Sequence, residues 1–382
     1  MKIKSFPAAA ALAVAAFAVA ALLGLMTAAS ADHDIRYLAF TADVHYNRND
    51  GTGENPFRAW MEKLRNVVPH VEYMAFLGDN SSAYSSDTWG EVGALMELAD
   101  SYKTSGFVLT DNLFLLGNHE RWTTAGGNFD AIRDSVEHTR RFMQAGKYLE
   151  TDGYALYSFG ADKTPEGAPY YGANYGGGGA QMFTEENIEA LDKYLKTVSA
   201  DIPVFIMSHY PIHTFTSPEG VDRESGNAEM LIDALNKYPN VIFLWGHNHS
   251  SADPLYDTFF HPGEMLHVGP LAENQMKEIK FYYASAGCMH DAEYRAARST
   301  SIPGGANVKG KGLLAVIDGA TITLTYYGID GNVVNTDIFT IGGYSQTASG
   351  FDMRMAVIII VTILLVIAAA LYVARRGKFK AD

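Results

Sequence analysis

The sequence predicts an α/β layered domain, followed by a transmembrane helix near the C-terminus. Three observations support this prediction. Short apolar runs that end in Gly, Asn, Asp or His alternate with longer helix-like stretches, which is typical of an α/β domain. Three β-rich runs, linked through Asp-Gly pairs, follow residue 310. An uncharged run of twenty residues lies close to the C-terminus.

The apolar runs are short and bounded by turn residues, so we expect them to form buried strands. They cover residues 36–42, 72–77, 113–116, 204–207 and 241–245. The helix-like stretches between them cover residues 57–68, 88–102, 128–145 and 185–198. Thr184 is the expected N-cap of the last helix. The β-rich runs cover residues 313–317, 322–327 and 333–341. Asp-Gly pairs between them favour tight turns, so we expect antiparallel hairpins to close the fold.

The N-terminus has the pattern of a secretory signal. Lys2 and Lys4 precede an uncharged, Ala-rich run over residues 5–31, which ends in the small residues Ala29 and Ala31. This pattern predicts a signal peptide over residues 1–31 that is cleaved after Ala31. The run is longer than the apolar core of a usual signal peptide, so an uncleaved N-terminal anchor is the alternative.

The C-terminal region has the pattern of a single membrane span. Residues 355–374 carry no charge and are long enough to cross a hydrocarbon layer of ~30 Å, with a buried core helix as the alternative. Basic residues follow this run, and positive residues beside a span stay in the cytoplasm. We therefore expect a domain over residues 32–345 outside the cytoplasm, a spacer over 346–354, a transmembrane helix over 355–374 and a cytoplasmic tail over 375–382.

Composition excludes several classes of protein. The chain has 382 residues, a formal net charge of −14 and 48% hydrophobic residues, and the hydrophobic fraction argues against disorder. Basic residues at both ends leave the segment between them more acidic than the whole chain. This acidity argues against binding to the backbone of a long nucleic acid. The single cysteine, Cys288, excludes an intramolecular disulfide and a cysteine-rich zinc cluster, and we expect it to be a small buried residue.

Residue types that bind metals follow each of the five apolar runs. The motifs are, in chain order, Asp43-Val44-His45, Gly78-Asp79-Asn80, Gly117-Asn118-His119-Glu120, Ser208-His209 and Gly246-His247-Asn248-His249. Strand ends in an open α/β sheet border the ligand crevice, so we expect these side chains to gather at one site. Imidazole, carboxylate and amide groups are suitable ligands for cations such as Zn, Fe and Mn.

This order of motifs resembles the calcineurin-like metallophosphoesterase superfamily, whose pattern is D-x-H, G-D, G-N-H-[DE], H and G-H-x-H. The resemblance spans roughly residues 35–345. It implies a four-layer α/β/β/α sandwich in which two sheets pack face to face. It also implies eight site residues: Asp43, His45 and His249 as ligands of one metal, Asn118, His209 and His247 as ligands of a second, Asp79 as the bridge between them, and His119 as the catalytic residue beside them.

The resemblance implies a hydrolase that cleaves phosphomonoesters or phosphodiesters with two divalent metal ions, which would be Mn, Zn or Fe. In such sites the ions hold the attacking and leaving oxygens, and a water between them becomes the nucleophilic hydroxide. His119 would protonate the leaving oxygen or stabilise the transition state. Ser82 stands where some members have an iron-binding tyrosine, so ferric iron is less expected than Mn or Zn.

We therefore expect a membrane-anchored phosphoesterase outside the cytoplasm, which acts on a small phosphorylated substrate, a phospholipid or another cell-envelope phosphoester. The alternative is a metal-loaded surface protein that binds or acts as a scaffold without turnover. Five residues near the motifs are either substrate contacts or ordinary loop residues, and the sequence leaves this open. They are Arg121, Tyr210, His213, Arg223 and His290.

Overall fold

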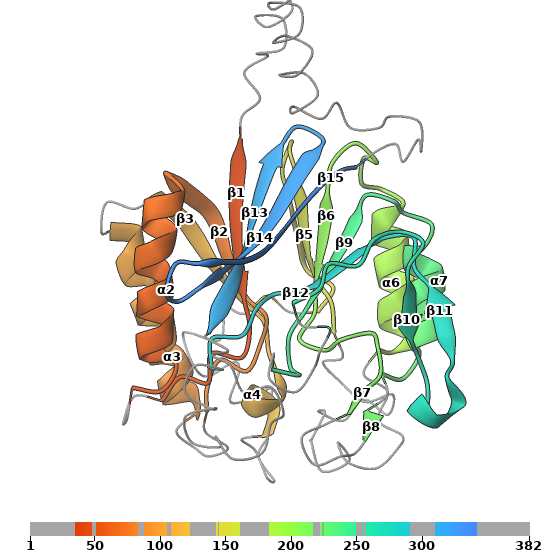
Figure 1. The fold of residues 1–382 in the computed structure, drawn as a ribbon, viewed down its shortest axis with the longest axis horizontal. Coiled ribbons are helices and arrows are strands. Elements are labelled where there is room, and N and C mark those ends of the chain that lie inside the picture. Colours follow the sequence, from red (N-terminus) through yellow and green to blue (C-terminus); the bar gives the residue numbers. More distant parts are fainter. Residues whose placement is uncertain are drawn as a thin grey trace, which may run out of the picture. The chain divides into compact units, whose positions relative to one another are not determined.

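Two β-sheets with helices beside them make up the part of the chain that the structure describes (Figure 1). The structure is a computed structural model. It describes residues 35–47, 51–82, 88–104, 108–122, 143, 145–160, 183–216, 222–223, 225–249, 255, 257–290 and 310–341. All of these residues belong to one unit of the chain, which ends at Gly342.

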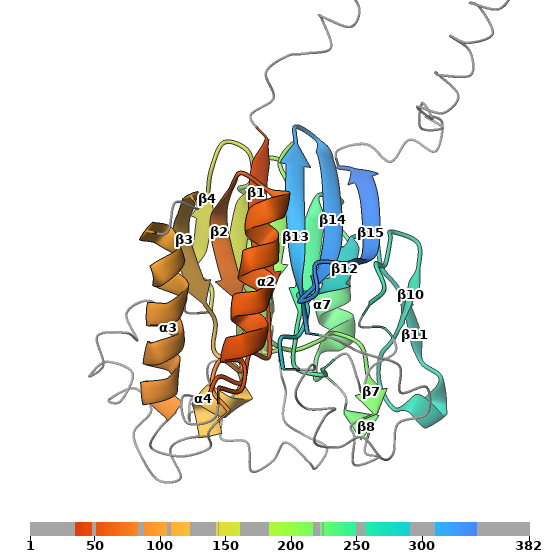
Figure 2. The same ribbon diagram turned by 60° about the vertical axis from the view of Figure 1, so that its left-hand side comes forward.

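The first sheet has six strands in the spatial order β15-β14-β13-β1-β2-β3. These strands are β1 (Arg36–Thr41), β2 (His70–Phe76), β3 (Val108–Phe114), β13 (Lys311–Asp318), β14 (Thr321–Gly328) and β15 (Val333–Thr340). The first three strands are parallel, and β13 pairs antiparallel with β1. Parallel neighbours need a crossover connection, and α2 (Glu54–Val67) and α3 (Thr88–Thr104) lie in these crossovers. Figure 2 shows both helices along one face of the sheet.

The second sheet has five strands in the spatial order β12-β9-β6-β5-β4. These strands are β4 (Tyr148–Glu150), β5 (Ala155–Ser158), β6 (Val204–Met207), β9 (Val241–Trp245) and β12 (Tyr282–Ser285). Four of them are parallel, and β4 joins the edge antiparallel to β5. Helices α6 (Glu185–Leu195) and α7 (Ala228–Leu235) lie in the connections between the parallel strands.

Apolar side chains from the two sheets pack against each other. Phe40 of β1 stacks on Phe205 of β6 with ring centroids 5.3 Å apart, inside a buried cluster that both sheets share. A second cluster joins the first sheet to α2 and α3, and a third joins the second sheet to α6 and α7. The layers therefore follow the order helix, sheet, sheet, helix (Figure 1). The α/β class predicted from the sequence is confirmed.

Several short elements lie outside the two sheets. Strands β7 (Phe215–Thr216) and β8 (Asp222–Arg223) form one small hairpin. Strands β10 (Met265–His267) and β11 (Met276–Glu278) form another, with the short 3-10 helix η3 (Leu271–Glu273) between them. Helix α4 (Asn118–Trp122) is a single short turn after β3.

Most of the predicted elements are confirmed within a few residues. The predicted strands at 36–42, 72–77, 204–207 and 241–245 are β1, β2, β6 and β9, and the three β-rich runs are β13, β14 and β15. The predicted helices at 57–68, 88–102 and 185–198 are α2, α3 and α6. The side chain of Thr184 accepts a hydrogen bond from the Asn187 amide, as expected of an N-cap. The strand predicted at 113–116 is wrong in its position, because β3 ends at Phe114.

Other predictions fall on residues that the structure does not describe. These are the signal peptide over 1–31, nearly all of the predicted helix over 128–145, the spacer over 346–354, the transmembrane helix over 355–374 and the tail over 375–382. Among the described residues, no helix combines the length and the apolar character that a membrane crossing requires.

Candidate metal centre

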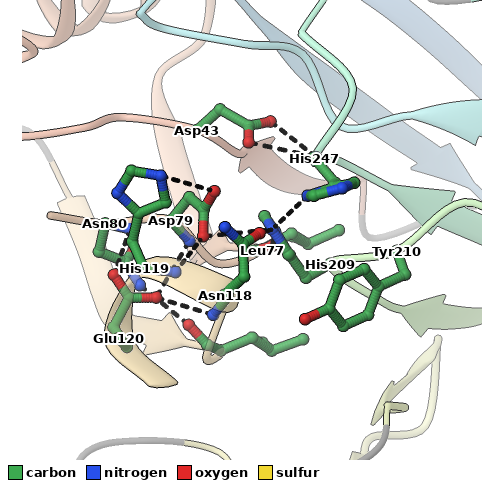
Figure 3. A network of polar contacts seen from close by, with 12 residues as sticks. Asp43, Leu77, Asp79, Asn80, Asn118, His119, Glu120, His209, Tyr210 and His247 are labelled. Atoms are coloured by element: carbon green, nitrogen blue, oxygen red, sulfur yellow. Dashed lines mark hydrogen bonds and ion pairs between the residues drawn. The ribbon is translucent and has the colours of Figure 1, made fainter. Parts of the chain in front are cut away.

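The seven predicted metal ligands lie just beyond the carboxyl ends of strands from both sheets. Figure 3 labels Asp43, Asp79, Asn118, His209 and His247 among them. Asp43 and His45 follow β1, Asp79 follows β2, Asn118 follows β3, His209 follows β6, and His247 and His249 follow β9. Backbone hydrogen bonds hold these turns against one another: the Asp43 amide donates to the Gly78 carbonyl at 3.1 Å, and the Gly246 amide donates to the His209 carbonyl at 3.1 Å. The structure therefore brings together residues that lie more than two hundred positions apart in the chain.

The turns that carry the candidate ligands have an unusual backbone conformation. Among the described residues, seven that are not glycine have a positive φ, and five of these are candidate ligands. Their φ angles are 50° at Asp43, 47° at His45, 51° at Asp79, 76° at His247 and 56° at His249. This region is unfavourable for residues with a Cβ, and such conformations concentrate at functional sites. The backbone strain supports the view that these positions serve a site.

One group of candidate ligands consists of Asp43, His45 and His249, whose ligand atoms all lie within 4.8 Å of one another. The Nε2 atoms of His45 and His249 are 3.0 Å apart, and Nε2 of His249 is 3.7 Å from Oδ1 of Asp43. Asp43 is fully buried. Its carboxylate also accepts hydrogen bonds from the backbone amide of His247 at 2.9 and 3.2 Å, which fixes its orientation.

A second group consists of Asp79, His209 and His247, again within 4.8 Å. Nε2 of His209 lies 3.3 Å from Oδ1 of Asp79, 3.3 Å from Nδ1 of His247 and 3.1 Å from Oδ1 of Asn118. The other ring nitrogen of His209 donates to the Leu77 carbonyl at 2.7 Å. That hydrogen bond leaves Nε2 of the neutral ring as the atom that can bind a metal.

Asp79 lies between the two groups. Its Oδ1 is directed at His209, whereas its Oδ2 lies 3.9 Å from Nε2 of His45 in the first group. Buried imidazole nitrogens and carboxylate or amide oxygens thus converge on two adjacent positions. This donor set is what borderline and hard divalent cations bind in proteins, so the residues fit a metal centre.

Burial sets the protonation of most of these histidines. It lowers the pKa of His45 and of His247 well below the ordinary histidine value, and neighbouring imidazoles add to the effect. Burial, followed by the repulsion of His290, lowers the pKa of His249 to about 3. These three rings are therefore neutral at pH 7 and present nitrogen lone pairs before any metal binds.

His209 behaves differently from the other three. Burial would lower its pKa, but the carboxylate of Asp79 outweighs burial and raises the pKa to about 9. Burial would likewise raise the pKa of Asp79, but His209 and His119 hold it well below the usual range of an aspartate. In the metal-free protein His209 and Asp79 therefore form a buried ion pair at neutral pH.

Metal uptake by the metal-free protein should release about one proton at pH 7.5, because a metal ligand must be deprotonated and His209 carries a proton below its pKa of about 9. The apparent affinity for Mn should rise roughly tenfold per pH unit up to pH 9 and then level off. Titration calorimetry in two buffers of different ionisation enthalpy measures the number of protons released. A value near zero at pH 7.5 would contradict the ion pair.

The same ion pair sets the sign of a stability change. A histidine pKa of about 9 in the folded state exceeds the unfolded value of about 6.5. Protonated His209 therefore stabilises the metal-free fold fully below about pH 6.5, and this stabilisation is lost as the pH rises through about 9.

His119, the predicted catalytic residue, lies in the first turn of α4 beside Asp79. Its backbone amide donates to Oδ1 of Asp79 at 2.9 Å, and its Nε2 lies 3.7 Å from Oδ2. The ring contacts that of His45 with centroids 4.4 Å apart. His45, Asp79 and His119 also form a third group of possible ligand atoms within 4.8 Å. The structure therefore places His119 at the metal centre, and its catalytic role stays a prediction.

A comparison with protein families identifies the chain. The model of the calcineurin-like phosphoesterase family matches residues 37–251, which is more than half of the chain and includes every candidate ligand. The chain belongs to the calcineurin-like phosphoesterase family. It is therefore a hydrolase that acts on phosphoric esters, in a family that depends on metal ions.

Solved structures of three other proteins are similar to this family member. Phosphopantetheinyl hydrolase from Mycobacterium tuberculosis is 15% identical, with 69% of this chain and 93% of that chain covered and a TM-score of 0.35. A predicted phosphoesterase from Streptococcus pneumoniae is 12% identical, with 80% and 98% covered and a TM-score of 0.27. A 5'-nucleotidase precursor from Thermus thermophilus is 11% identical, with 80% and 55% covered and a TM-score of 0.35. No curated protein matches by sequence.

Glu120, the acidic residue that ends the family motif G-N-H-[DE], supports the turn that carries Asp79. Its buried carboxylate accepts four backbone hydrogen bonds. Oε1 accepts from the amides of Asn80 at 2.7 Å and Ser81 at 3.0 Å, and Oε2 accepts from the amides of Asp79 at 3.1 Å and Gly117 at 2.7 Å. This role of Glu120 was not predicted from the sequence, although its position inside the motif was a signal.

Gly117, in the same motif, is needed for close packing. A Cβ at this position would lie 2.2 Å from both the amide nitrogen and Oδ1 of Asp79. A larger residue would therefore displace the carboxylate that lies between the two ligand groups.

A chain of polar contacts connects to the turn between the candidate ligands His247 and His249. Nδ1 of His213 lies 2.6 Å from the Tyr283 hydroxyl, and its Nε2 lies 3.4 Å from the side-chain nitrogen of Asn248. Asn248 separates His247 from His249, and His213 is fully buried. These contacts link the ligand turn to the second sheet, and no local sequence signal predicted them.

The structure also shows the surroundings of two other residues that the sequence singled out. Tyr210 is almost fully buried and its ring contacts that of His209 at 5.0 Å. Cys288 is fully buried, as predicted. The side chains of Arg121 and Arg223 lie outside the part of the chain that the structure describes.

Proposed function

We propose that this chain binds two divalent metal ions and uses them to hydrolyse phosphomonoesters or phosphodiesters outside the cytoplasm, at a membrane surface. The observation that carries the proposal is the placement of Asp79. Its Oδ1 is 3.3 Å from Nε2 of His209 and its Oδ2 is 3.9 Å from Nε2 of His45, so one oxygen is directed at each ligand group. A carboxylate can bridge two cations because both of its oxygens accept.

The ligand groups divide the seven residues in the way that the sequence resemblance implies. Asp43, His45 and His249 would hold one ion, Asn118, His209 and His247 would hold the other, and Asp79 would contact both. The donor atoms suit Mn, Zn or Fe. When bound, two such ions would hold the phosphoryl oxygens and make a water easier to deprotonate.

The residues around the metal positions supply orientation and proton handling. The His247 amide fixes the carboxylate of Asp43, and the Leu77 carbonyl fixes the ring of His209, so the ligand atoms are oriented in advance. His119 lies next to Asp79 and His45, where its ring can donate a hydrogen bond or its proton to the leaving ester oxygen. No protein nucleophile is required, and the buried Cys288 takes no part.

The substrate in this proposal is a small phosphorylated molecule, a phospholipid or another phosphoester of the cell envelope. The acidic character of the chain supports this choice, because a long nucleic acid would meet a surface of the same sign of charge. A site that lies close to a membrane would encounter envelope phosphoesters at high local concentration.

The proposed location rests on the two ends of the sequence. The signal-like segment over residues 1–31 and the uncharged run over 355–374 would place the domain outside and the tail over 375–382 in the cytoplasm. Protease added to intact cells should therefore digest the domain, whereas an epitope tag on the tail should stay protected until the membrane is permeabilised. A domain that survives in intact cells and is digested only after permeabilisation would contradict this location.

Hydrolysis by the purified, detergent-solubilised chain tests the activity. The Mn-loaded protein should hydrolyse p-nitrophenyl phosphate or its bis ester, lose activity after chelation, and regain it when Mn is restored, because the ligand groups would then refill. The ratio of kcat/KM for the two esters decides between a monoesterase and a diesterase. A metal-replete protein that hydrolyses neither ester would contradict the proposal.

A further inference from the structure

His290 lies on a segment that is bonded directly to the turn carrying the first ligand group. The segment follows β12 of the second sheet. Its Met289 amide donates to the Ala42 carbonyl at 3.2 Å, and its His290 amide donates to the Asp43 carbonyl at 3.0 Å. In the other direction, the Ala42 amide donates to the Gly287 carbonyl at 3.1 Å. These hydrogen bonds fix the backbone of His290 relative to Asp43.

The ring of His290 lies against two candidate ligands without joining their donor groups. Its centroid is 4.6 Å from that of His45 and 5.6 Å from that of His249. Among the described residues, the three groups whose ligand atoms lie within 4.8 Å of one another do not include His290. His290 therefore borders the first ligand group and lies outside it in this structure.

Exposure differs between the floor of the site and the imidazoles around it. Asp43, Asp79 and His209 have at most 2% of their surface exposed, so they form the floor of the site. The side chain of His249 is 18% exposed, and His290 is half-buried. His247 is also half-buried, so these three imidazoles are the more exposed part of the site among the described residues, and His249 and His290 lie beside the first metal position.

We propose that His290 is a substrate-binding residue that donates a hydrogen bond from its imidazole to a non-bridging oxygen of the phosphoryl group. A neutral imidazole carries one N–H donor, and a phosphoryl oxygen is a strong acceptor. His45 then lies between two rings, with His119 at 4.4 Å and His290 at 4.6 Å. This inference rests on the proposed function, because it needs a phosphoryl group at the metal centre.

The test compares His290→Ala and His290→Gln with the wild type and with a control, His261→Ala. His261 has an exposed side chain that pairs with Asp337 and lies outside the candidate centre. Metal content is measured per chain, and the affinity of the Mn-loaded proteins for inorganic phosphate is measured by titration calorimetry. KM and kcat for p-nitrophenyl phosphate are measured in parallel.

We expect the metal content to stay at the wild-type value in both His290 variants. His290→Ala should weaken phosphate binding about tenfold, or about 1.4 kcal/mol, and should raise KM more than it lowers kcat. His290→Gln keeps an N–H donor and should recover part of the phosphate affinity. His261→Ala should match the wild type.

Two results would overturn the inference. If His290→Ala bound phosphate within twofold of the wild-type affinity, His290 would have a structural role only. If that variant lost metal, His290 would be a metal ligand. The proposed function fails separately, when the wild type binds metal and phosphate but hydrolyses neither ester. In that case weaker phosphate binding by His290→Ala would still support the inference.

Discussion

Replacing Asp79 by asparagine should lower kcat/KM for p-nitrophenyl phosphate by roughly 10³-fold or more, which corresponds to about 4 kcal/mol of transition-state stabilisation. The two oxygens of Asp79 are directed at different ligand groups, 3.3 Å from His209 and 3.9 Å from His45. An asparagine has one oxygen and one NH₂ group, and the NH₂ group cannot bind a cation. One of the two groups therefore loses its ligand oxygen and the other keeps only a neutral one, so we expect metal content to fall below that of the wild type.

The matched control for this substitution is Asp318→Asn. Asp318 is exposed and ends β13, which runs antiparallel to β1, so it lies at the opposite end of the sheet from Asp43. Asparagine also suits the Asp-Gly turn at this position. The control should keep the activity and metal content of the wild type. An Asp79→Asn protein that retains activity within tenfold of the wild type, with full metal content, would show that Asp79 does not bridge.

The ligand positions could be predicted because their signal is local. Strands β6 and β9 lie in a sheet that is covered on both faces, so all of their residues are buried and the sequence shows continuous apolar runs. Each candidate ligand then follows a strand end within four residues. Parallel strands direct these ends to the same edge of the sheet, which makes the gathering of the motifs predictable.

Edge strands gave a weaker signal, and this explains the misplaced strand. β3 is an edge strand of the first sheet and contains Asp111 and Asn112. Asp111 pairs with Lys103 of α3, and the Asn112 side chain donates to Asp100 of α3, so both polar residues have partners on that helix. An apolar pattern cannot reveal such partners.

Helix α7 was not predicted, for another reason. Asn227 at its N-cap has a left-handed backbone conformation, and its side chain makes no capping hydrogen bond.

The contacts that position His290 and His213 could not be predicted from the sequence. The position of His290 depends on the pairing of Ala42 with Cys288, which join the ends of strands from different sheets. The contact of His213 with Asn248 depends on how two turns of the second sheet meet. Periodicity describes which face of a strand is buried, but it does not specify which turn lies beside another. The sequence left a substrate-contact role open for His213 and His290, and the partners of both residues became known only from the fold.

Glu120→Gln should be the most damaging of the substitutions at positions that are not candidate ligands. The carboxylate accepts four backbone hydrogen bonds, two at each oxygen, and Glu120 is fully buried. A glutamine would direct an NH₂ group at two of these amides. Each buried donor without an acceptor costs about 1–3 kcal/mol, so we expect a loss of roughly 2–6 kcal/mol in the free energy of unfolding. Tm should fall by roughly 5–10 °C.

The same substitution should also reduce activity, because the hydrogen bonds from the amides of Asp79, Asn80 and Ser81 to Glu120 position the turn that carries Asp79. Thermal unfolding followed by circular dichroism, with kcat/KM measured well below Tm, separates the two effects. Glu97→Gln is the matched control, since Glu97 lies on α3 with an exposed side chain and should leave Tm unchanged. If the Tm of Glu120→Gln lay within about a degree of the wild-type Tm, the four hydrogen bonds would not be what positions Asp79 between the ligand groups.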